Sequence, residues 1–247
     1  MPILITDLSL LFRLLIGHVV GDFLVQTRSM VQEKEAMNWK SSRLYIHAGL
    51  YSLVVYLMSS AWAQGVWLIP VLFASHALID GWKATRRKRT YSFMIDQMLH
   101  LAVLVVAFFL LSTAWVAPEK LFWFWKSPRV LCAVLGYLLV LWPFGRLMQV
   151  LTFPLRSQIE GQSSRGLESA GFWIGCLERA FLLSFILLNY LPGVALLLGL
   201  KSIFRFGEIK DPDNRKEAEY ILIGTLLSFG FAIGVGLVIK YISLRLL

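Results

Sequence analysis

All four histidines of this 247-residue chain lie within its first hundred positions, and three of them stand four residues from an aspartate. The set comprises His18 with Asp22, His76 with Asp80, Asp96 with His100, and His47 without such a neighbour. Residues four apart share one face of a helix, so each pair can present an imidazole nitrogen beside a carboxylate. Imidazole and carboxylate without thiolate suit zinc, iron or manganese, and zinc is favoured for hydrolytic chemistry.

The segments that carry these residues are apolar, and so is the rest of the chain. Hydrophobic residues make up 57% of the sequence, which is more than a soluble domain usually contains. Long runs with few charges recur throughout, so residues 1–247 are predicted to form one integral membrane domain. Ionisable groups inside membrane spans are costly and are functional by default. The net charge of +9 is interpreted as loop charge that sets orientation, and no nucleic-acid partner is expected.

Spans of roughly 20 residues predict an all-α bundle of about eight transmembrane helices. The expected spans are 6–27, 43–62, 66–84, 92–116, 128–150, 170–190, 192–206 and 217–240. The first four form a His/Asp-bearing half, 1–116, and the others a second helical half, 128–247. Basic residues gather in alternate loops, most densely at 28–42 and 85–91. The positive-inside rule places these loops in the cytoplasm and both termini outside.

With this topology the paired residues and the lone histidine fall in one layer, roughly 6–14 Å below the cytoplasmic boundary. Helices joined by short loops tend to be neighbours, so these side chains are predicted to meet in one pocket. A catalytic zinc needs about three protein ligands and one open position. The layer holds more candidate ligands than one metal site needs. Either some of these residues orient a metal-binding histidine by contacting its second ring nitrogen, or the layer binds two metals.

The expected roles follow from this layer. The predicted metal ligands are His18, Asp22, His47, His76, Asp80 and His100. Asp96 and Glu178 are the predicted acid–base groups, and an ion pair with Lys201 is the alternative role of Glu178. Gln26, Lys34 and Lys83 lie at the mouth of the layer, where they can position an anion.

Two functions are compatible with this pattern. One is a membrane hydrolase whose metal-bound water attacks an ester or phosphoester of a lipid or amphipathic molecule at the cytoplasmic leaflet. The other is a transporter or carrier in which the buried groups bind a metal ion or relay protons. A transporter needs a polar route across the midplane, whereas the outer helix halves are apolar and favour a one-sided site. Hydrogen bonding across helices is the purely structural alternative for each histidine, and small residues in the last helix permit a homo-oligomer.

Several strings resemble a known family. GHVVGDFLVQT, IHAGLY, SHALIDGWK and DQMLH, followed by IGCLERAF and KSIFRFGEIKD, are similar to the bacterial multi-pass membrane family named domain of unknown function 3307. The resemblance implies a helical protein of the bacterial inner membrane and no established activity. The spacing of histidine and aspartate also resembles that of the YdjM-type membrane-bound metal-dependent hydrolases, which implies hydrolase chemistry.

Overall fold

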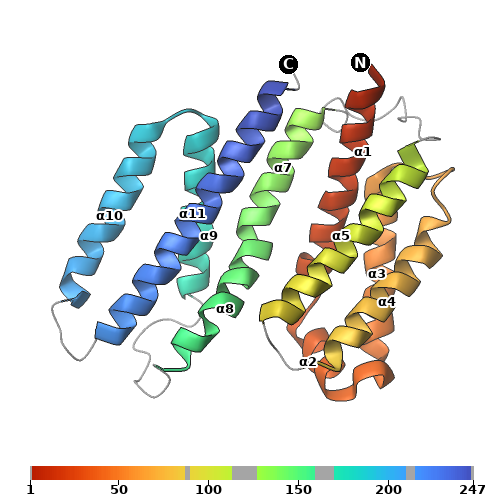
Figure 1. Ribbon diagram of the computed structural model, residues 1–247, viewed down its shortest axis with the longest axis horizontal. Coiled ribbons are helices and arrows are strands. Elements are labelled where there is room, and N and C mark those ends of the chain that lie inside the picture. The colour runs from red at the N-terminus through yellow and green to blue at the C-terminus, as the bar shows by residue number, and fades with distance from the viewer. Residues whose placement is uncertain (1, 87–89, 113–126, 159–169, 210–214, 246–247) are drawn as a thin grey trace. The chain divides into compact units, whose positions relative to one another are not determined.

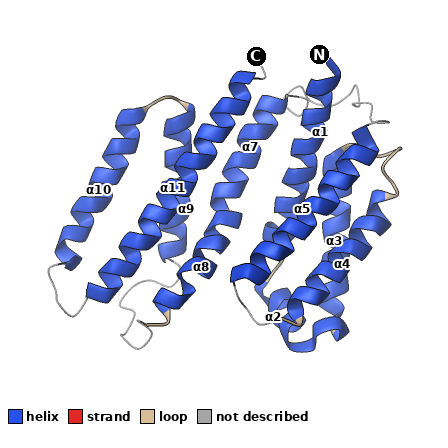
Figure 2. Cartoon of the chain, viewed as in Figure 1, coloured by secondary structure: helices blue, strands red, loops and turns tan. Residues whose placement is uncertain are grey.

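The computed structural model describes residues 2–86, 90–112, 127–158, 170–209 and 215–245. Within these ranges the chain is helical apart from short turns and contains no β-strand (Figure 2). The predicted all-α class is confirmed for this part of the chain. The centre of the second basic loop, residues 87–89, lies outside it.

The chain divides into two compact units, Met1–Leu138 and Leu139–Arg245. The first contains α1 (Pro2–Val19), a π-helical turn (Val20–Leu24), α2 (Arg28–Met37), a 3-10 turn (Asn38–Lys40), α3 (Ser42–Ser59), α4 (Leu68–Ala84), α5 (Thr90–Ser112) and most of α7 (Pro128–Leu141). Helix α3 packs against both α1 and α4, and α4 packs against α5 (Figure 1). The region 28–42, expected as a loop, is therefore largely helical.

Local sequence signals explain how α2 and α3 begin. The Thr27 side chain accepts a hydrogen bond from the backbone N–H of Met30, and the Ser41 side chain accepts one from that of Leu44. Such caps satisfy N–H groups that the first turn of a helix leaves without a partner. Ser60 then ends α3 in the left-handed region, with φ of 55°.

Glycine allows α1 and α3 to approach each other closely. A Cβ atom on Gly17 would lie 2.9 Å from Val55 Cα, and one on Gly21 would lie 2.8 Å from Tyr51 Cδ2. Beyond this crossing, the first unit holds a core of buried apolar side chains, which comprises Leu10, Leu14, Val55, Ala61, Leu68, Leu72, Leu104, Ala107 and Leu111. Tyr51 belongs to the same core and also contacts the histidines. The apolar core and the polar cluster therefore adjoin.

The second unit contains α8 (Pro143–Arg156), α9 (Ala170–Leu187), α10 (Leu191–Ile209) and α11 (Arg215–Arg245). Helix α11 packs against the other three. Arg179 of α9 is buried, and its guanidinium donates to the carbonyl oxygens of Val140 and Leu141 and to Ser228 Oγ. These carbonyls lie at the end of α7, where a helix leaves its last acceptors without intrahelical partners. Arg179 thus satisfies the end of one helix from within another.

Fewer helices meet a strict test for membrane spans than the eight expected from the sequence. Four stretches within the described residues are long and apolar enough: Tyr91–Ser112, Pro128–Arg156, Ala170–Leu187 and Ala218–Arg245. A fifth is added if Leu8–Leu24 and Arg28–Lys40, bent by 77°, form one broken span. Helix α4 has only 17 residues, and α3 carries Arg43, His47 and three tyrosines, which lower its hydropathy.

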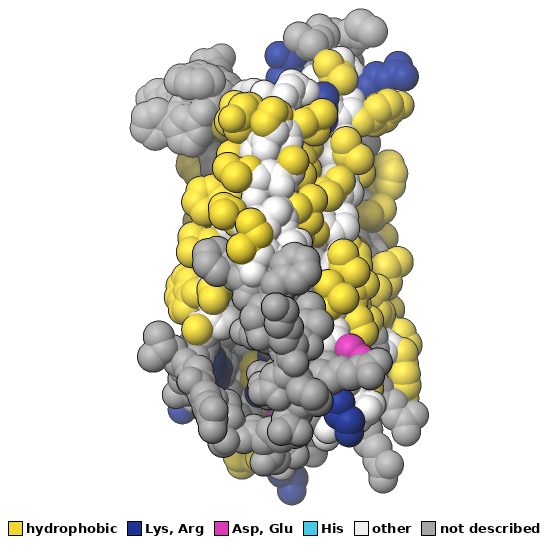
Figure 3. Space-filling model, turned by 90° about the vertical axis from the view of Figure 1, so that its left-hand side faces the viewer, with side chains coloured by type: hydrophobic (Ala, Val, Ile, Leu, Met, Phe, Trp, Pro, Cys, Tyr) yellow, Lys and Arg dark blue, Asp and Glu magenta, His cyan; other side chains and the backbone are white. Residues whose placement is uncertain are grey.

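The surface agrees with a membrane protein. Figure 3 shows a face on which apolar side chains cover most of the described helix surface, with Lys and Arg towards the two ends. No more than a third of the residues in each candidate span is buried inside the protein. The remaining apolar side chains can face lipid, because a span must present a hydrophobic surface to the hydrocarbon core.

Candidate metal centre

The metal-ligating residue types come together at the end of the first unit where α2 lies (Figure 1). His76 and Asp80 lie one turn apart on α4, with His76 Nε2 3.7 Å from Asp80 Oδ2. Asp96 and His100 have the same relation on α5, with His100 Nε2 3.5 Å from Asp96 Oδ1. A contact of 3.7 Å between His100 Nε2 and Asp80 Oδ1 joins the two pairs.

The remaining pair, on α1, is arranged differently. Asp22 lies in the π-helical turn, in which the N–H of Val25 reaches back to the carbonyl of Val20. The extra residue in such a turn alters the direction of the side chains after it. Asp22 Oδ1 consequently faces His47 Nε2 at 3.6 Å and His76 Nε2 at 3.9 Å. The i, i+4 spacing from His18 therefore identified Asp22 as a member of the cluster, but it did not identify the histidines that Asp22 contacts.

The centre of the cluster holds polar atoms without ordinary partners. His76 Nδ1 and Nε2, His100 Nε2 and Asp96 Oδ1 are buried and have no hydrogen-bond partner among the described residues. The rings of His76 and His100 stack, with centroids 4.3 Å apart. Buried polar groups without a partner are costly, and each such group needs an explanation such as an ion or a role in catalysis.

A metal ion fits these spacings. Ligands about 2.1 Å from a tetrahedral zinc lie roughly 3.4 Å from one another. The separations of 3.5 to 3.7 Å between the imidazole nitrogens and the carboxylate oxygens of Asp80 and Asp96 are close to that value and too long for hydrogen bonds. Three overlapping groups have the required proximity: Asp22 with His47 and His76, His76 with Asp80 and His100, and Asp22 with Asp96 and His100. In the second group both imidazoles have a free Nε2, so it is the best prepared for a metal.

His47 and His18 are less available than the other two histidines. Gln26 Nε2 donates to His47 Nε2 at 2.9 Å, which uses the lone pair of that nitrogen. His18 Nε2 donates to Gln97 Oε1 at 3.3 Å, and His18 Nδ1 accepts from the Tyr51 hydroxyl at 3.1 Å. The amide of Gln97 fixes this tautomer, because its oxygen can only accept. His18 is thus placed beside the centre but belongs to none of the three groups.

Tyr51 and Gln97 were not predicted from the sequence. The Gln97 amide donates to Asp22 Oδ2 at 2.9 Å and to Asp96 Oδ2 at 3.1 Å, so it orients two carboxylates. The Tyr51 ring stacks on His76 with centroids 3.8 Å apart. Tyr51 follows His47 by four residues, which is the same spacing that identified the pairs. The sequence therefore contained a pattern that could have identified Tyr51, but no pattern that pointed to Gln97.

Two lysines neutralise two of the three carboxylates. Lys34 of α2 forms a buried ion pair with Asp80, and Lys83 at the end of α4 forms one with Asp96. The Lys34 side chain is 8% exposed and that of Lys83 is 36% exposed. Gln26, Lys34 and Lys83 contact His47, Asp80 and Asp96 directly, and their predicted role in positioning an anion remains a prediction.

The segment 28–40 covers this end of the cluster and is anchored at its far side. Glu33 Oε1 accepts hydrogen bonds from Ser41 Oγ at 3.0 Å and from the Arg43 backbone N–H at 3.3 Å. The ring of Trp39 lies over Gly81, where a Cβ would come within 2.3 Å of it. The absence of a side chain at position 81, next to Asp80, lets the covering segment lie close to the centre.

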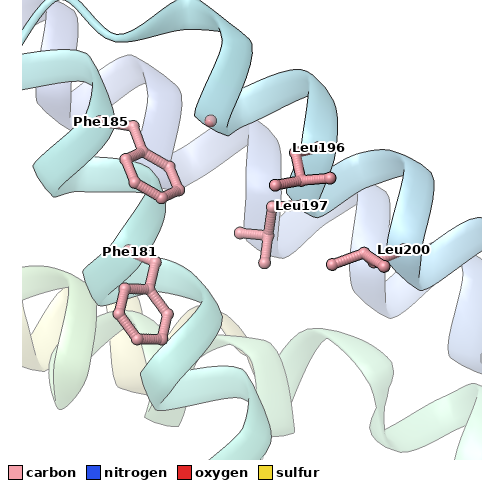
Figure 4. Close-up of a pocket in the computed structure, with 6 residues that line it drawn as sticks. Phe181, Phe185, Leu196, Leu197 and Leu200 are labelled. Atoms are coloured by element: carbon pink, nitrogen blue, oxygen red, sulfur yellow. The ribbon is translucent and has the colours of Figure 1, made fainter.

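The second unit contributes differently. Glu178 forms an ion pair with Lys201 of α10, which was the alternative role foreseen for it, and it is in none of the three ligand groups. A pocket of about 200 Å³ between α9 and α10 is lined by Phe181, Phe185, Gly193, Leu196, Leu197 and Leu200 (Figure 4). This pocket offers no polar side chain for chemistry.

One family model matches the part of the chain that contains the cluster. Residues 10–124 match the model of the family described as Protein of unknown function (DUF3307). The resemblance seen in the sequence is supported over that stretch, which contains every residue of the three ligand groups. The quoted strings of the second half lie outside the matched residues. No curated protein and no solved structure matches the chain.

Proposed function

We propose that this protein is a membrane-embedded, metal-dependent hydrolase that acts on an ester or phosphoester of a lipid or amphipathic molecule. The observation that carries the proposal is the pair of buried, unpartnered Nε2 atoms of His76 and His100, both within 3.7 Å of Asp80 oxygens. Two imidazoles and one carboxylate with room for a further ligand are the protein ligands of many catalytic zinc sites. Imidazole and carboxylate ligands also suit iron and manganese, and zinc is favoured here because the proposed chemistry is hydrolytic.

The charge of the cluster also suits a single divalent ion. Asp22, Asp80 and Asp96 with the ammonium groups of Lys34 and Lys83 leave one net negative charge when the imidazoles are neutral. A divalent cation together with one anionic ligand makes the cluster neutral, which a membrane interior favours. A bound metal of this kind supplies a nucleophile at neutral pH by lowering the pKa of water.

The surrounding residues have roles that fit hydrolysis. Asp96 Oδ1 is buried, lacks a hydrogen-bond partner within the described residues and lies 3.5 Å from His100 Nε2. A carboxylate in this position can accept a proton as a general base. Lys83, whose side chain is partly exposed, can reach an anionic head group from the edge of the site. Gln97 and Tyr51 hold the carboxylates and a histidine ring in place.

The apolar core argues for a hydrolase over a transporter. On the side of the centre away from α2, most buried residues are apolar, among them Leu14, Val55, Leu72 and Leu104, with Arg13 and Ser59 the main polar exceptions. Transporter sites typically lie near the membrane midplane and are formed by several broken helices. Helices α3, α4 and α5 run unbroken past this centre, and α1 alone among these four is interrupted, at Val20–Leu24. A site near one end of the helices, with mostly apolar packing beyond it, suits a substrate held in one leaflet.

We further propose that the chain crosses the bacterial inner membrane eight times, with both termini outside and the centre near the cytoplasmic leaflet. The basic residues Arg28, Lys40 and Arg43 surround the covering segment at the same end as the cluster. Basic loops remain in the cytoplasm during insertion, so this arrangement supports a cytoplasmic site.

Cysteine labelling in intact cells tests the orientation. We expect Ala36→Cys and Arg86→Cys to resist an impermeant maleimide, and Gln64→Cys, in the turn between α3 and α4, to react. All three positions are exposed, whereas the native Cys132 and Cys176 are buried, so the unmodified protein serves as the blank. Rapid labelling at positions 36 and 86 before the cells are opened would reverse the topology and move the site to the outer leaflet.

Metal analysis and an activity screen test the function. The full chain, purified in detergent without chelator, is expected to contain about one zinc per chain. It should hydrolyse at least one member of a panel of lipid carboxylic esters, phosphomonoesters and phosphodiesters, and lose that activity on dialysis against a chelator. A protein that binds no stoichiometric divalent metal at neutral pH would refute the hydrolase, and a proton-relay transporter would then explain the cluster better.

A further inference from the structure

Lys34 occupies the oxygen atom of Asp80 that a metal ion beside His76 would need. Its ammonium donates to Asp80 Oδ2, and the side chain is almost completely enclosed. The same Oδ2 atom lies 3.7 Å from His47 Nε2 and 3.7 Å from His76 Nε2. An ammonium group and a divalent metal cannot share one carboxylate oxygen at close range without strong repulsion.

Lys83 provides a contrast within the same cluster. It binds Oδ2 of Asp96, whereas Oδ1 of that carboxylate is the atom that faces His100 and lacks a hydrogen-bond partner among the described residues. A metal beside His100 can therefore approach Asp96 while Lys83 stays in place. At Asp80 the ammonium and His76 face the same oxygen, Oδ2, whereas His100 faces Oδ1. A metal bound through Oδ2, beside His76, therefore competes with Lys34.

We propose that Lys34 is a built-in counter-cation that the metal displaces from Asp80, after which its ammonium binds the anionic group of the substrate. This inference rests on the proposed metal site and names the substrate as a phosphate or carboxylate head group. Without metal, the buried carboxylate needs a positive partner, and lysine supplies it as a point charge on a flexible stem. With metal present, that requirement ends, and the freed ammonium remains next to the reacting centre.

The covering segment is built to permit this exchange without unfolding. Glu33, the neighbour of Lys34, holds α2 to the start of α3 through Ser41 and Arg43. These contacts involve neither Asp80 nor any of the histidines. The Lys34 side chain can therefore change its rotamer while α2 remains attached.

Zinc affinity measured by competition with a chromophoric chelator tests the displacement. We expect Lys34→Met to bind zinc at least tenfold more tightly than the wild type, because zinc no longer has to expel a cation. Lys83→Met should change the affinity less than threefold, and Lys40→Met, at an exposed lysine of the same segment, should not change it. Equal gains in Lys34→Met and Lys83→Met would indicate general electrostatics and overturn the exchange. An unchanged or weaker affinity in Lys34→Met would also overturn it.

Thermal melting provides a readout that does not depend on the chelator. Lys34→Met leaves Asp80 without its partner in the metal-free state, so its metal-free Tm should fall below that of the wild type. Zinc should then raise the Tm of Lys34→Met by more than it raises that of the wild type, because the tighter ligand stabilises more. An equal or smaller rise in the variant would contradict the exchange. A wild type that binds no zinc at all would instead refute the proposed function.

Phosphate binding tests the second step. Inorganic phosphate titrated into the zinc-loaded wild type should bind, and zinc-loaded Lys34→Met should bind it about tenfold more weakly. Zinc-loaded Lys40→Met is the matched control and should behave as the wild type does. Equal phosphate affinity in Lys34→Met and the wild type would remove Lys34 from the anion site even if zinc displaces it.

Discussion

Replacing either His76 or Asp80 is expected to remove both the bound metal and the hydrolytic activity from a protein that still folds. The two residues lie one turn apart on α4, so one rigid helix presents two ligands to the same ion. Loss of either ligand opens the coordination shell. Groups that only orient a ligand typically cost 10–100-fold when lost, so loss of a ligand itself should exceed about 100-fold.

The variants His76→Ala and Asp80→Asn suit this test, because Asn keeps the shape of the side chain beside Lys34. Ser75→Ala is the matched control: Ser75 precedes His76 on α4, and its hydroxyl donates to the Leu72 carbonyl at 3.2 Å. Elemental analysis, activity and thermal melting should be measured on all three. If the histidine were only a structural hydrogen-bonding residue, the variant would lose about 0.6 kcal/mol of stability and keep whatever metal the wild type has. That result would count against a metal centre.

The site could be predicted from the sequence where helix geometry alone decides it. His76 with Asp80 and Asp96 with His100 lie on regular helices, so their spacing of four gave both the residues and their mutual contact. The lone His47 was placed in the same layer by topology, and it does lie beside Asp22 and Asp80. In a regular helix the spacing alone shows which side chains one turn apart are neighbours, so these contacts can be predicted without knowing the rest of the fold.

Other parts of the site depend on structure that the period does not encode. The π-helical turn at Val20–Leu24 changes the direction of the Asp22 side chain, and no residue in that segment predicts such a turn. The segment 28–42 is too polar to be predicted as a span, so its helix α2 and the contact of Lys34 with Asp80 were not foreseen. Long side chains such as Lys34 and Gln97 can reach in several directions, and only the packed fold selects one.

The number of spans was uncertain for a related reason. Helix α3 carries Arg43, His47 and tyrosines within a segment that packs between α1 and α4. Those residues serve the cluster and the packing, and they lower the hydropathy by which a span is recognised. The exposed side of α3 remains apolar, with Ile46, Leu53 and Leu57 on it, so a test based on mean hydropathy passes over a helix that can still face lipid.

Gly17→Ala is expected to lower the stability and weaken metal binding, although a single methyl group is added and no site residue is changed. The new Cβ would lie 2.9 Å from Val55 Cα, which is backbone of α3 and cannot move aside as a side chain can. Overpacking of this kind costs roughly 1–3 kcal/mol. Because α1 carries Asp22 and α3 carries His47, separation of these helices should also loosen the cluster.

Gly49→Ala is the matched control, since it adds the same methyl group to α3 at a position with no atom within 4 Å of the new Cβ. Alanine is favoured over glycine within a helix by up to about 1 kcal/mol, so this variant should be as stable as the wild type or more so. Thermal melting and zinc titration of the two variants separate a specific helix contact from a general effect of replacing glycine. Equal behaviour of Gly17→Ala and Gly49→Ala would mean that α1 and α3 do not need their close approach to hold the centre together.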